Sequence, residues 1–325
     1  MSLPTFTLTT TAEDVATVFA DQIKGKNVLI TGTSIGGIGF EAARVLAKHA
    51  NLVIITGYNS ERLRLSEEAI KKELPAANIR QLVLDLSSLA MVRKAAAEVN
   101  AYPEPLHVLI NNAACGDAEY HLTVDGLEKQ MATDYIGPFL FTKLLAPKLL
   151  AARTETYTPR VVNVSSGAHA FITAFELTEG AVAHSSPEQV PFARYGQTKS
   201  ANILFAGELS KRSGGKINGY SLHPGLIATN INTKESNKAH MISIGILTPE
   251  GLPNTEKYEW KTMAQGAATT VAAAFDTRFD ACPGAYLVDS IEANDKIGPI
   301  ARDPNNAAAL WTVTEHILGE AFSFD

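Results

Sequence analysis

Short apolar runs alternate with helical patterns along most of the chain. The runs lack the strict apolar–polar alternation of a strand with one face in water, so we expect both of their faces to be buried. Helical periodicity fills the intervals at 39–50 and 60–74. This order predicts an α/β fold, with one doubly wound parallel sheet and helices on both of its faces. The predicted strands are 27–32, 52–57, 79–86, 106–113, 160–166, 216–225 and 284–288.

Two long segments interrupt this rhythm, at 167–194 and 225–262. Both follow predicted strands, at the sheet edge where open α/β sheets bind ligands. Loops this long are more often functional than idle, so we expect them to form the substrate side of a site. No linker or repeat divides the chain, and residues 1–325 are predicted to form a single domain.

Composition narrows the classes of partner. The net charge is −6, the pI is about 5.8, and no long basic run is present, which argues against nucleic acid. Cys115 and Cys282 are the two cysteines and have no metal-ligand spacing, so we expect a reducing compartment and no metal. The N-terminus lacks the layout of a signal peptide, and no apolar stretch is long enough for a membrane span. The expectation is a cytoplasmic protein.

The stretch TGTSIGGIG at 31–39 follows the first predicted strand and opens a helix. That context is the one a dinucleotide-binding turn of the Rossmann type requires, because glycine lets the backbone approach a pyrophosphate at a helix N-terminus. We assign Gly32, Gly37 and Gly39 to the turn, with Ser34 and Ile38 beside them. Gly36 permits a second register.

The end of the second strand bears on which nicotinamide cofactor binds. An acidic residue there is typical of NAD, whereas a nearby arginine is typical of NADP. Tyr58 stands at this point with no acidic residue at the tip, and Arg62 follows four residues later. The pattern favours NADP(H), with NAD(H) as the alternative. Asp85 and Leu86 end the third strand and are candidates for the adenine side, although Asp85 could equally begin a helix.

Several further motifs occur in a fixed order around these. They are LDLSS (84–88), LINNAA (109–114), VVNVSSGAH (161–169), a Y-x-x-x-K pair at Tyr195 and Lys199, and HPGLIAT (223–229). Together with the glycine turn, the chain resembles the short-chain dehydrogenase/reductase family over about residues 25–290. The particular residues in these motifs are similar to those of the retinol-dehydrogenase-like branch and of fungal family members that act in secondary metabolism.

The resemblance implies roles for named residues. Ser166 would bind the substrate oxygen, with Ser165 as its competitor, and Tyr195 would be the acid/base. A free tyrosine has a pKa near 10, so a nearby ammonium such as Lys199 is needed to stabilise tyrosinate. Asp134 stands where the family carries a catalytic asparagine, and we expect its carboxyl to be protonated or paired. The remaining cofactor contacts implied are Asn112, Ala113, Pro224, Gly225 and Thr229, with Tyr195 and Lys199 on the nicotinamide side.

These features predict an NADP(H)-preferring oxidoreductase that interconverts a carbonyl and an alcohol on a small, fairly apolar molecule. Two alternatives remain at this stage. One is a non-catalytic dinucleotide-binding sensor or scaffold, and the other is the same fold performing dehydration, epimerisation or rearrangement. Pairing through long helices at about 122–150 and 194–213 would give a homodimer, and a tail helix would either cover the substrate cleft or pack on the core.

Overall fold

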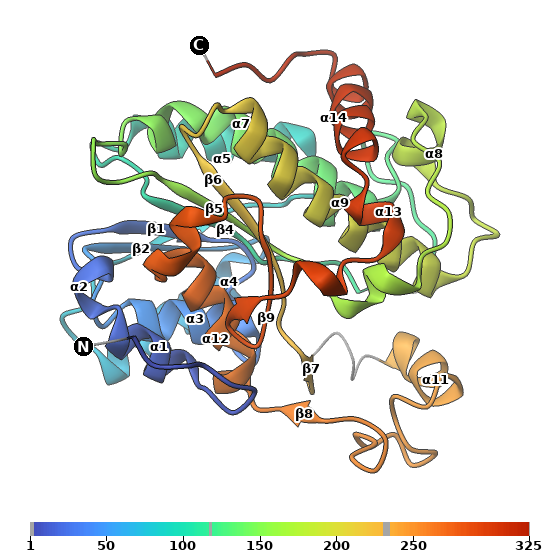
Figure 1. Ribbon diagram of the computed structural model, residues 1–325, viewed down its shortest axis with the longest axis horizontal. Helices are drawn as coiled ribbons and strands as arrows, with labels where there is room; N and C mark the ends of the chain where they lie inside the picture. Colours follow the sequence, from blue (N-terminus) through green and yellow to red (C-terminus); the bar gives the residue numbers. More distant parts are fainter. Residues whose placement is uncertain (1–2, 117–118, 230–234, 325) are drawn as a thin grey trace.

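The computed structural model describes residues 3–116, 119–229 and 235–324 (Figure 1). Its centre is an eight-stranded sheet in the order β10-β9-β6-β5-β4-β1-β2-β3. All neighbouring strands are parallel except β10, which pairs antiparallel with β9. The strands are β1 Asn27–Ile30, β2 Leu52–Gly57, β3 Ile79–Val83, β4 Val108–Asn111, β5 Arg160–Val164, β6 Asn218–His223, β9 Tyr286–Val288 and β10 Ile291–Glu292. The prediction of a doubly wound α/β sheet is confirmed.

Helices cover both faces of this sheet, and each face has its own apolar core. Along β1, Leu29 belongs to one core and Val28 and Ile30 to the other, as the alternation of side chains along a strand requires. The first core lies under α5 Leu89–Ala101, α7 Gly137–Leu150, α9 Pro191–Arg212 and α14 Pro304–Leu318. The second lies under α1 Ala12–Val18, α2 Ala20–Ile23, α3 Ile38–Leu46, α4 Ser60–Glu73 and α12 Met263–Phe275.

The helix predicted from residue 122 begins later. Residues before it form a turn around Gly126, whose φ of +74° suits glycine, and an antiparallel bridge joins Leu122 to Glu128. The Glu128 side chain then accepts the amide hydrogens of Gln130 and Met131 and caps the short helix α6 Lys129–Met131. A π-helical turn, Ala132–Ile136, connects α6 to α7. Pro138 lies just after this turn, in the first turn of α7.

The two long segments contain short elements of their own. The first holds a 3₁₀ helix, Gly167–Phe171, and α8 Glu179–His184, and its last residues already belong to α9. The second holds β7 Leu226–Ile227, α11 Glu235–Ser243 and β8 Trp260–Lys261, with β7 and β8 forming a small parallel pair. Figure 1 shows β7, β8 and α11 below the sheet, away from α14, whereas α8 of the first segment lies beside α14.

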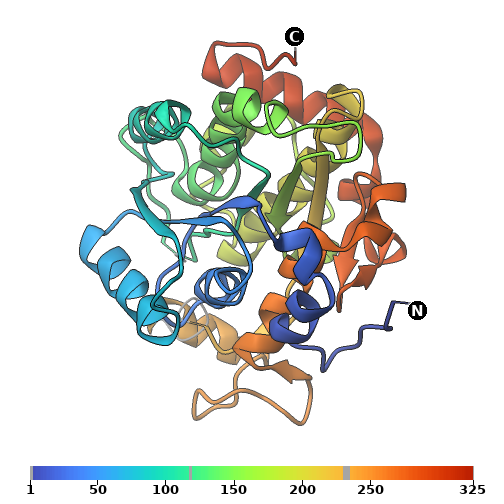
Figure 2. The same ribbon diagram turned by 90° about the vertical axis from the view of Figure 1, so that its left-hand side faces the viewer.

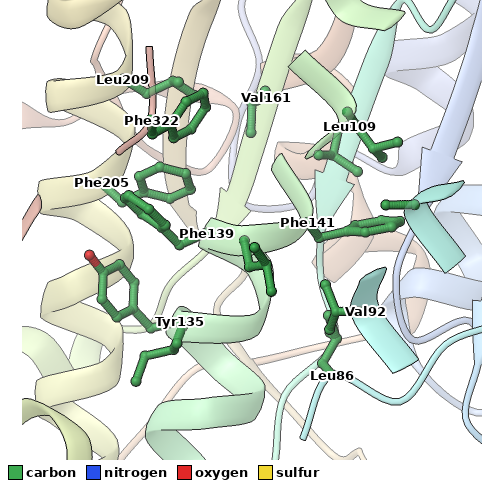
Figure 3. Close-up of a cluster of buried hydrophobic side chains, with 14 of the residues drawn as sticks. Leu86, Val92, Leu109, Tyr135, Phe139, Phe141, Val161, Phe205, Leu209 and Phe322 are labelled. Carbon is green, nitrogen blue, oxygen red and sulfur yellow. The ribbon is translucent and has the colours of Figure 1, made fainter. Parts of the chain in front are cut away.

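The C-terminal residues pack on the core rather than hanging free. After two 3₁₀ turns, Thr277–Ala281 and Asn294–Lys296, and α13 Pro299–Arg302, helix α14 lies across the layer formed by α7 and α9 (Figure 2). Trp311 of α14 is buried among the rings of Phe139, Phe205 and Phe322. Figure 3 shows the phenylalanines of this cluster beside Tyr135, whose hydroxyl hydrogen-bonds Thr314 of α14.

No helix in the described part of the chain combines the length and the apolar character that crossing a membrane would require.

Candidate active site

The residues predicted for cofactor and substrate follow the carboxyl ends of neighbouring parallel strands. The glycine turn follows β1, Tyr58 follows β2 and Asp85 follows β3. On the other side, Asn112 follows β4, Ser166 follows β5 and Pro224 follows β6. Since all of these strands run parallel, the residues meet at one sheet edge. The strand order changes direction between β1 and β4, the position at which such sheets bind ligands.

The glycine turn is fixed to the loop after β4 by a set of hydrogen bonds. The Thr31 hydroxyl accepts the amide hydrogens of Asn112 (2.9 Å) and Ala113 (3.0 Å). The Asn112 side-chain amide donates to the carbonyls of Thr31 (2.8 Å) and Gly32 (3.0 Å). A Cβ on Gly39 would lie 2.3 Å from that amide nitrogen and 2.6 Å from the Gly32 oxygen. The predicted glycines at 32 and 39 are therefore required for this close approach.

In the middle of the turn, one glycine adopts a backbone conformation that favours glycine and the other does not. Gly36 has a φ of +81°, whereas Gly37 has an extended backbone and is the cap residue of α3. Having no side chain, Gly37 leaves the first-turn amides of α3 to a ligand, as a pyrophosphate-binding helix requires. The amide of Gly37 bonds the Ser34 carbonyl (3.1 Å), and Ile38 packs towards Gly266 of α12. The cradle fits a dinucleotide phosphate group.

The ribose end of the predicted site is open. Tyr58 is 68% exposed and Arg62 is exposed in the first turn of α4, which Asn59 caps. Asp85 is not the cap of the next helix. Its carboxylate instead accepts the amide and hydroxyl hydrogens of Ser87, while Ser88 caps α5. Leu86, the other residue assigned to this end, is buried.

The two serines after β5 differ in their surroundings. Ser165 is buried, and its hydroxyl donates to the Lys199 carbonyl (2.7 Å), which ties β5 to α9. Ser166 is half-buried, and its Oγ accepts the Ala168 amide hydrogen (3.2 Å). The geometry therefore makes Ser165 a structural residue and leaves Ser166 as the hydroxyl that can meet a substrate.

Tyr195 and Lys199 lie on one face of α9, as their spacing predicts. The Lys199 ammonium is 5.2 Å from the centre of the Tyr195 ring. It also forms an ion pair with Asp134 of the π-helical turn, with 3.0 Å between Nζ and Oδ2. The Asp134 Oδ1 accepts the Cys115 amide hydrogen at 2.6 Å, so the loop after β4 also holds the carboxylate. Asp134 was expected to be protonated or paired, and the structure shows it paired.

Burial and charge act together on this pair. Burial by itself would lower the pKa of Lys199, but the Asp134 carboxylate leads the influences that outweigh this effect and raise the pKa, so the lysine remains an ammonium. Burial raises the pKa of Asp134 against the opposing influence of Lys199 and of the Cys115 amide. The negative charge of this carboxyl thus depends on the ammonium beside it.

Beyond β6, the predicted Pro224–Gly225 turn rests on a lysine that sequence reasoning missed. Gly225 has a φ of +94°, and a Cβ there would lie 2.6 Å from the Lys261 side chain. Lys261 is buried and pairs with Asp289 in the turn between β9 and β10. His223 accepts the Gly167 amide hydrogen through Nδ1 (3.1 Å) and so joins this turn to the residue after Ser166. Thr229 is half-buried, and its amide donates to the Ile227 carbonyl (2.8 Å).

A surface hollow of about 390 Å³ lies between α8 and α9. Its lining includes Phe175, Ser186 and Gln197, of which Phe175 and Ser186 lie within the segment 167–194 expected on the substrate side. Neither Ser166 nor Tyr195 lines it. We therefore do not assign the substrate to this hollow.

Comparison with known proteins agrees with this arrangement. A family model described as short chain dehydrogenase matches residues 26–176. The short-chain dehydrogenase/reductase prx1 of Penicillium roqueforti is 34% identical over 317 residues, covering 92% of this chain and 86% of that protein. The short-chain dehydrogenase TIC 32 B, chloroplastic, of Brassica napus is 36% identical over 286 residues, with 86% and 84% covered.

A solved structure supports the same assignment. A putative uncharacterised protein from Mycobacterium paratuberculosis has a TM-score of 0.68 and 28% identity, covering 93% of this chain and 98% of that one. The fold and the dinucleotide-binding turn define a Rossmann-type oxidoreductase. The chain belongs to the short-chain dehydrogenase/reductase family.

Proposed function

We propose that this protein is an NADP(H)-preferring oxidoreductase that interconverts a carbonyl and an alcohol on a small, fairly apolar molecule. The observation that carries the proposal is the placement of Tyr195 and a buried Lys199 on one face of α9, beside the end of β5. Ser166 and the glycine cradle lie at the same edge of the sheet. The proposal takes the whole chain as one dinucleotide-binding domain with two substrate loops.

Each side chain has a separate task. Bound nicotinamide would supply or accept the hydride. Ser166 donates a hydrogen bond to the substrate oxygen and holds it towards Tyr195. Tyr195 delivers its phenolic proton to that oxygen during reduction and removes a proton from the alcohol during oxidation. Lys199 supplies the positive charge that stabilises tyrosinate.

The cofactor preference has a simple electrostatic argument. A 2′-phosphate is repelled by a carboxylate at the end of β2 and attracted by a guanidinium there. Tyr58 occupies that end, and Arg62 is exposed one helical turn away on α4. Both features support NADP(H) over NAD(H).

The direct test is a panel of aldehydes, ketones and quinones assayed with NADPH and with NADH, following the absorbance of the reduced nicotinamide. We expect turnover with NADPH that Tyr195→Phe abolishes. Tyr102→Phe is the matched control, because Tyr102 is near the opposite edge of the sheet and bonds Glu98. Equal turnover in Tyr195→Phe would remove the acid/base role. Tight cofactor binding without turnover on any substrate would instead indicate a sensor.

A further inference from the structure

The ion pair between Asp134 and Lys199 is enclosed. Its two side chains are 0% and 2% exposed, and its charged atoms are 3.0 Å apart. The Cys115 amide holds one carboxylate oxygen, and the Thr198 hydroxyl approaches the other to 3.5 Å. With supports from α9 and from the loop after β4, the carboxylate has little freedom to turn away from the lysine.

The backbone around Asp134 explains why it reaches Lys199. Asp134 lies in the π-helical turn, in which the Gly137 amide bonds the Ala132 carbonyl five residues earlier. A Cβ at Gly137 would lie 2.4 Å from the Leu86 carbonyl oxygen, so only glycine fits at this point. Pro138 has no amide hydrogen to offer the Asp134 carbonyl four residues earlier. Such single π turns frequently occur at functional sites.

A carboxylate at this position changes the charge that Tyr195 meets. Lys199 alone would present a full positive charge to the phenol, whereas the pair with Asp134 is close to neutral overall. The other ionisable groups near the pair are the Cys115 thiol and Glu128, which caps α6 and is influenced by Arg194. Neither of these two groups is a cation, and the Arg194 guanidinium, which acts electrostatically on Glu128, donates to the Gln189 carbonyl.

We propose that Asp134 is a positioning residue that offsets the charge of Lys199 beside Tyr195, so that less of this charge is available to stabilise tyrosinate and the site favours carbonyl reduction. This inference rests on the proposed oxidoreductase function. A phenol is the form that donates a proton to a substrate oxygen, whereas alcohol oxidation needs tyrosinate. The rate of oxidation therefore develops at a higher pH, and the rate of reduction persists to a higher pH, than an uncompensated lysine would allow.

The test is Asp134→Asn, which removes the charge and keeps the size of the side chain. We expect the pH–rate profiles for both directions to move to lower pH by about one unit, as a nearby charge typically produces. A readout without turnover is the ultraviolet absorbance of tyrosinate, measured as the difference from Tyr195→Phe in the same background. It should appear at correspondingly lower pH in Asp134→Asn.

The matched control is Glu208→Gln. Glu208 is also a buried carboxylate of α9 that binds a cation, with 2.6 Å between its Oε1 and Arg212 Nε, but it lies more than two turns beyond Lys199. Its removal should leave both profiles unchanged. If Asp134→Asn does not fold, Asp134→Ser also removes the charge and has a smaller polar side chain.

Unshifted profiles and an unshifted tyrosinate absorbance in the charge-removing variant would overturn the inference, while leaving the proposed function intact. Persistent turnover in Tyr195→Phe would instead remove the acid/base role of Tyr195 from the proposed function. The two failures are thus distinguishable.

Discussion

Gly39→Ala tests whether the hydrogen bonds between the glycine turn and the loop after β4 support cofactor binding. The new methyl carbon would lie 2.3 Å from the Asn112 amide nitrogen and 2.6 Å from the Gly32 oxygen. Both contacts are far closer than van der Waals distance, and the second partner is backbone that cannot rotate away. The Asn112 side chain would have to leave the carbonyls of Thr31 and Gly32.

The magnitude follows from these contacts. Two lost hydrogen bonds cost about 0.5–1.5 kcal/mol each, and overpacking adds about 1–3 kcal/mol. The higher helix propensity of alanine returns about 1 kcal/mol, because Gly39 lies within α3. We expect the free energy of unfolding to fall by about 1–5 kcal/mol, centred near 3 kcal/mol. Since about 1.4 kcal/mol corresponds to a tenfold change in affinity, distortion of the cradle by a similar amount weakens NADPH binding at least tenfold.

The assay combines urea unfolding with titration of NADPH fluorescence. Gly207→Ala is the matched control, because Gly207 also lies inside a helix, α9, and a Cβ there meets nothing within 4 Å. That variant should be unchanged or more stable by up to about 1 kcal/mol. NADPH affinity and stability of Gly39→Ala within error of the wild type would refute the idea that this contact organises the cradle.

Three further predictions concern the tail, the cofactor and pH. Trp311→Ala should lower the free energy of unfolding, measured in urea, by about 3–5 kcal/mol, since Trp311 is 1% exposed. Trp260 is half-buried, so a smaller loss in Trp311→Ala than in Trp260→Ala would contradict this prediction. Arg62→Glu should weaken NADPH binding about tenfold or more by titration and leave NADH unchanged, and equal losses would argue against a phosphate contact. Burial, with Lys26 or Lys261 nearby, lowers the pKa of His107 and of His223 from 6.5 to about 4. The folded protein therefore keeps both histidines neutral at a pH where the unfolded chain protonates them. Their contribution to the free energy of unfolding is complete above pH 6.5 and is lost as the pH falls towards 4. In urea titrations at several pH values, the free energy of unfolding of His107→Asn and of His223→Asn should fall less between pH 6.5 and 4 than that of the wild type. An unchanged pH dependence would exclude these histidines as its source.

The strands could be predicted because burial on both faces leaves a continuous apolar run in the sequence. What the pattern could not show were elements whose apolar residues are few. Helix α1 buries only Ala12, Val15 and Ala16, and α2 buries only Ile23, with the buried Phe19 between the two helices. The signal that could have found α1 is its capping box, in which Thr11 and Asp14 bond each other's backbone amides. The edge strand β10 is exposed and two residues long, so it leaves no apolar run at all.

The candidate site was predictable where the backbone conformation requires one residue type, and less so where two side chains distant in the sequence come into contact. Gly32 has a φ of +72° and its motif is visible in the sequence, whereas the ion pair of Asp134 with Lys199 joins separate helices. Sequence reasoning could require that a buried carboxyl be paired, but not name its partner. Lys261 was missed because nothing in the surrounding letters distinguishes a buried lysine from a solvated one.

The position of α14 bears on how a second copy could approach. Pairing through the long helices would use α7 and α9, yet in this chain α14 packs against α9, and Trp311 and Phe322 contact Phe139 of α7 (Figure 2). Arg212 of α9 lies over the Trp311 ring, and Glu320 forms ion pairs with Lys143 of α7 and Arg93 of α5. These contacts hold the tail across the helix layer at several points. A partner arriving from that side therefore meets α14 and its tail first, and a dimer through bare α7 and α9 would require the loss of the buried Trp311 cluster.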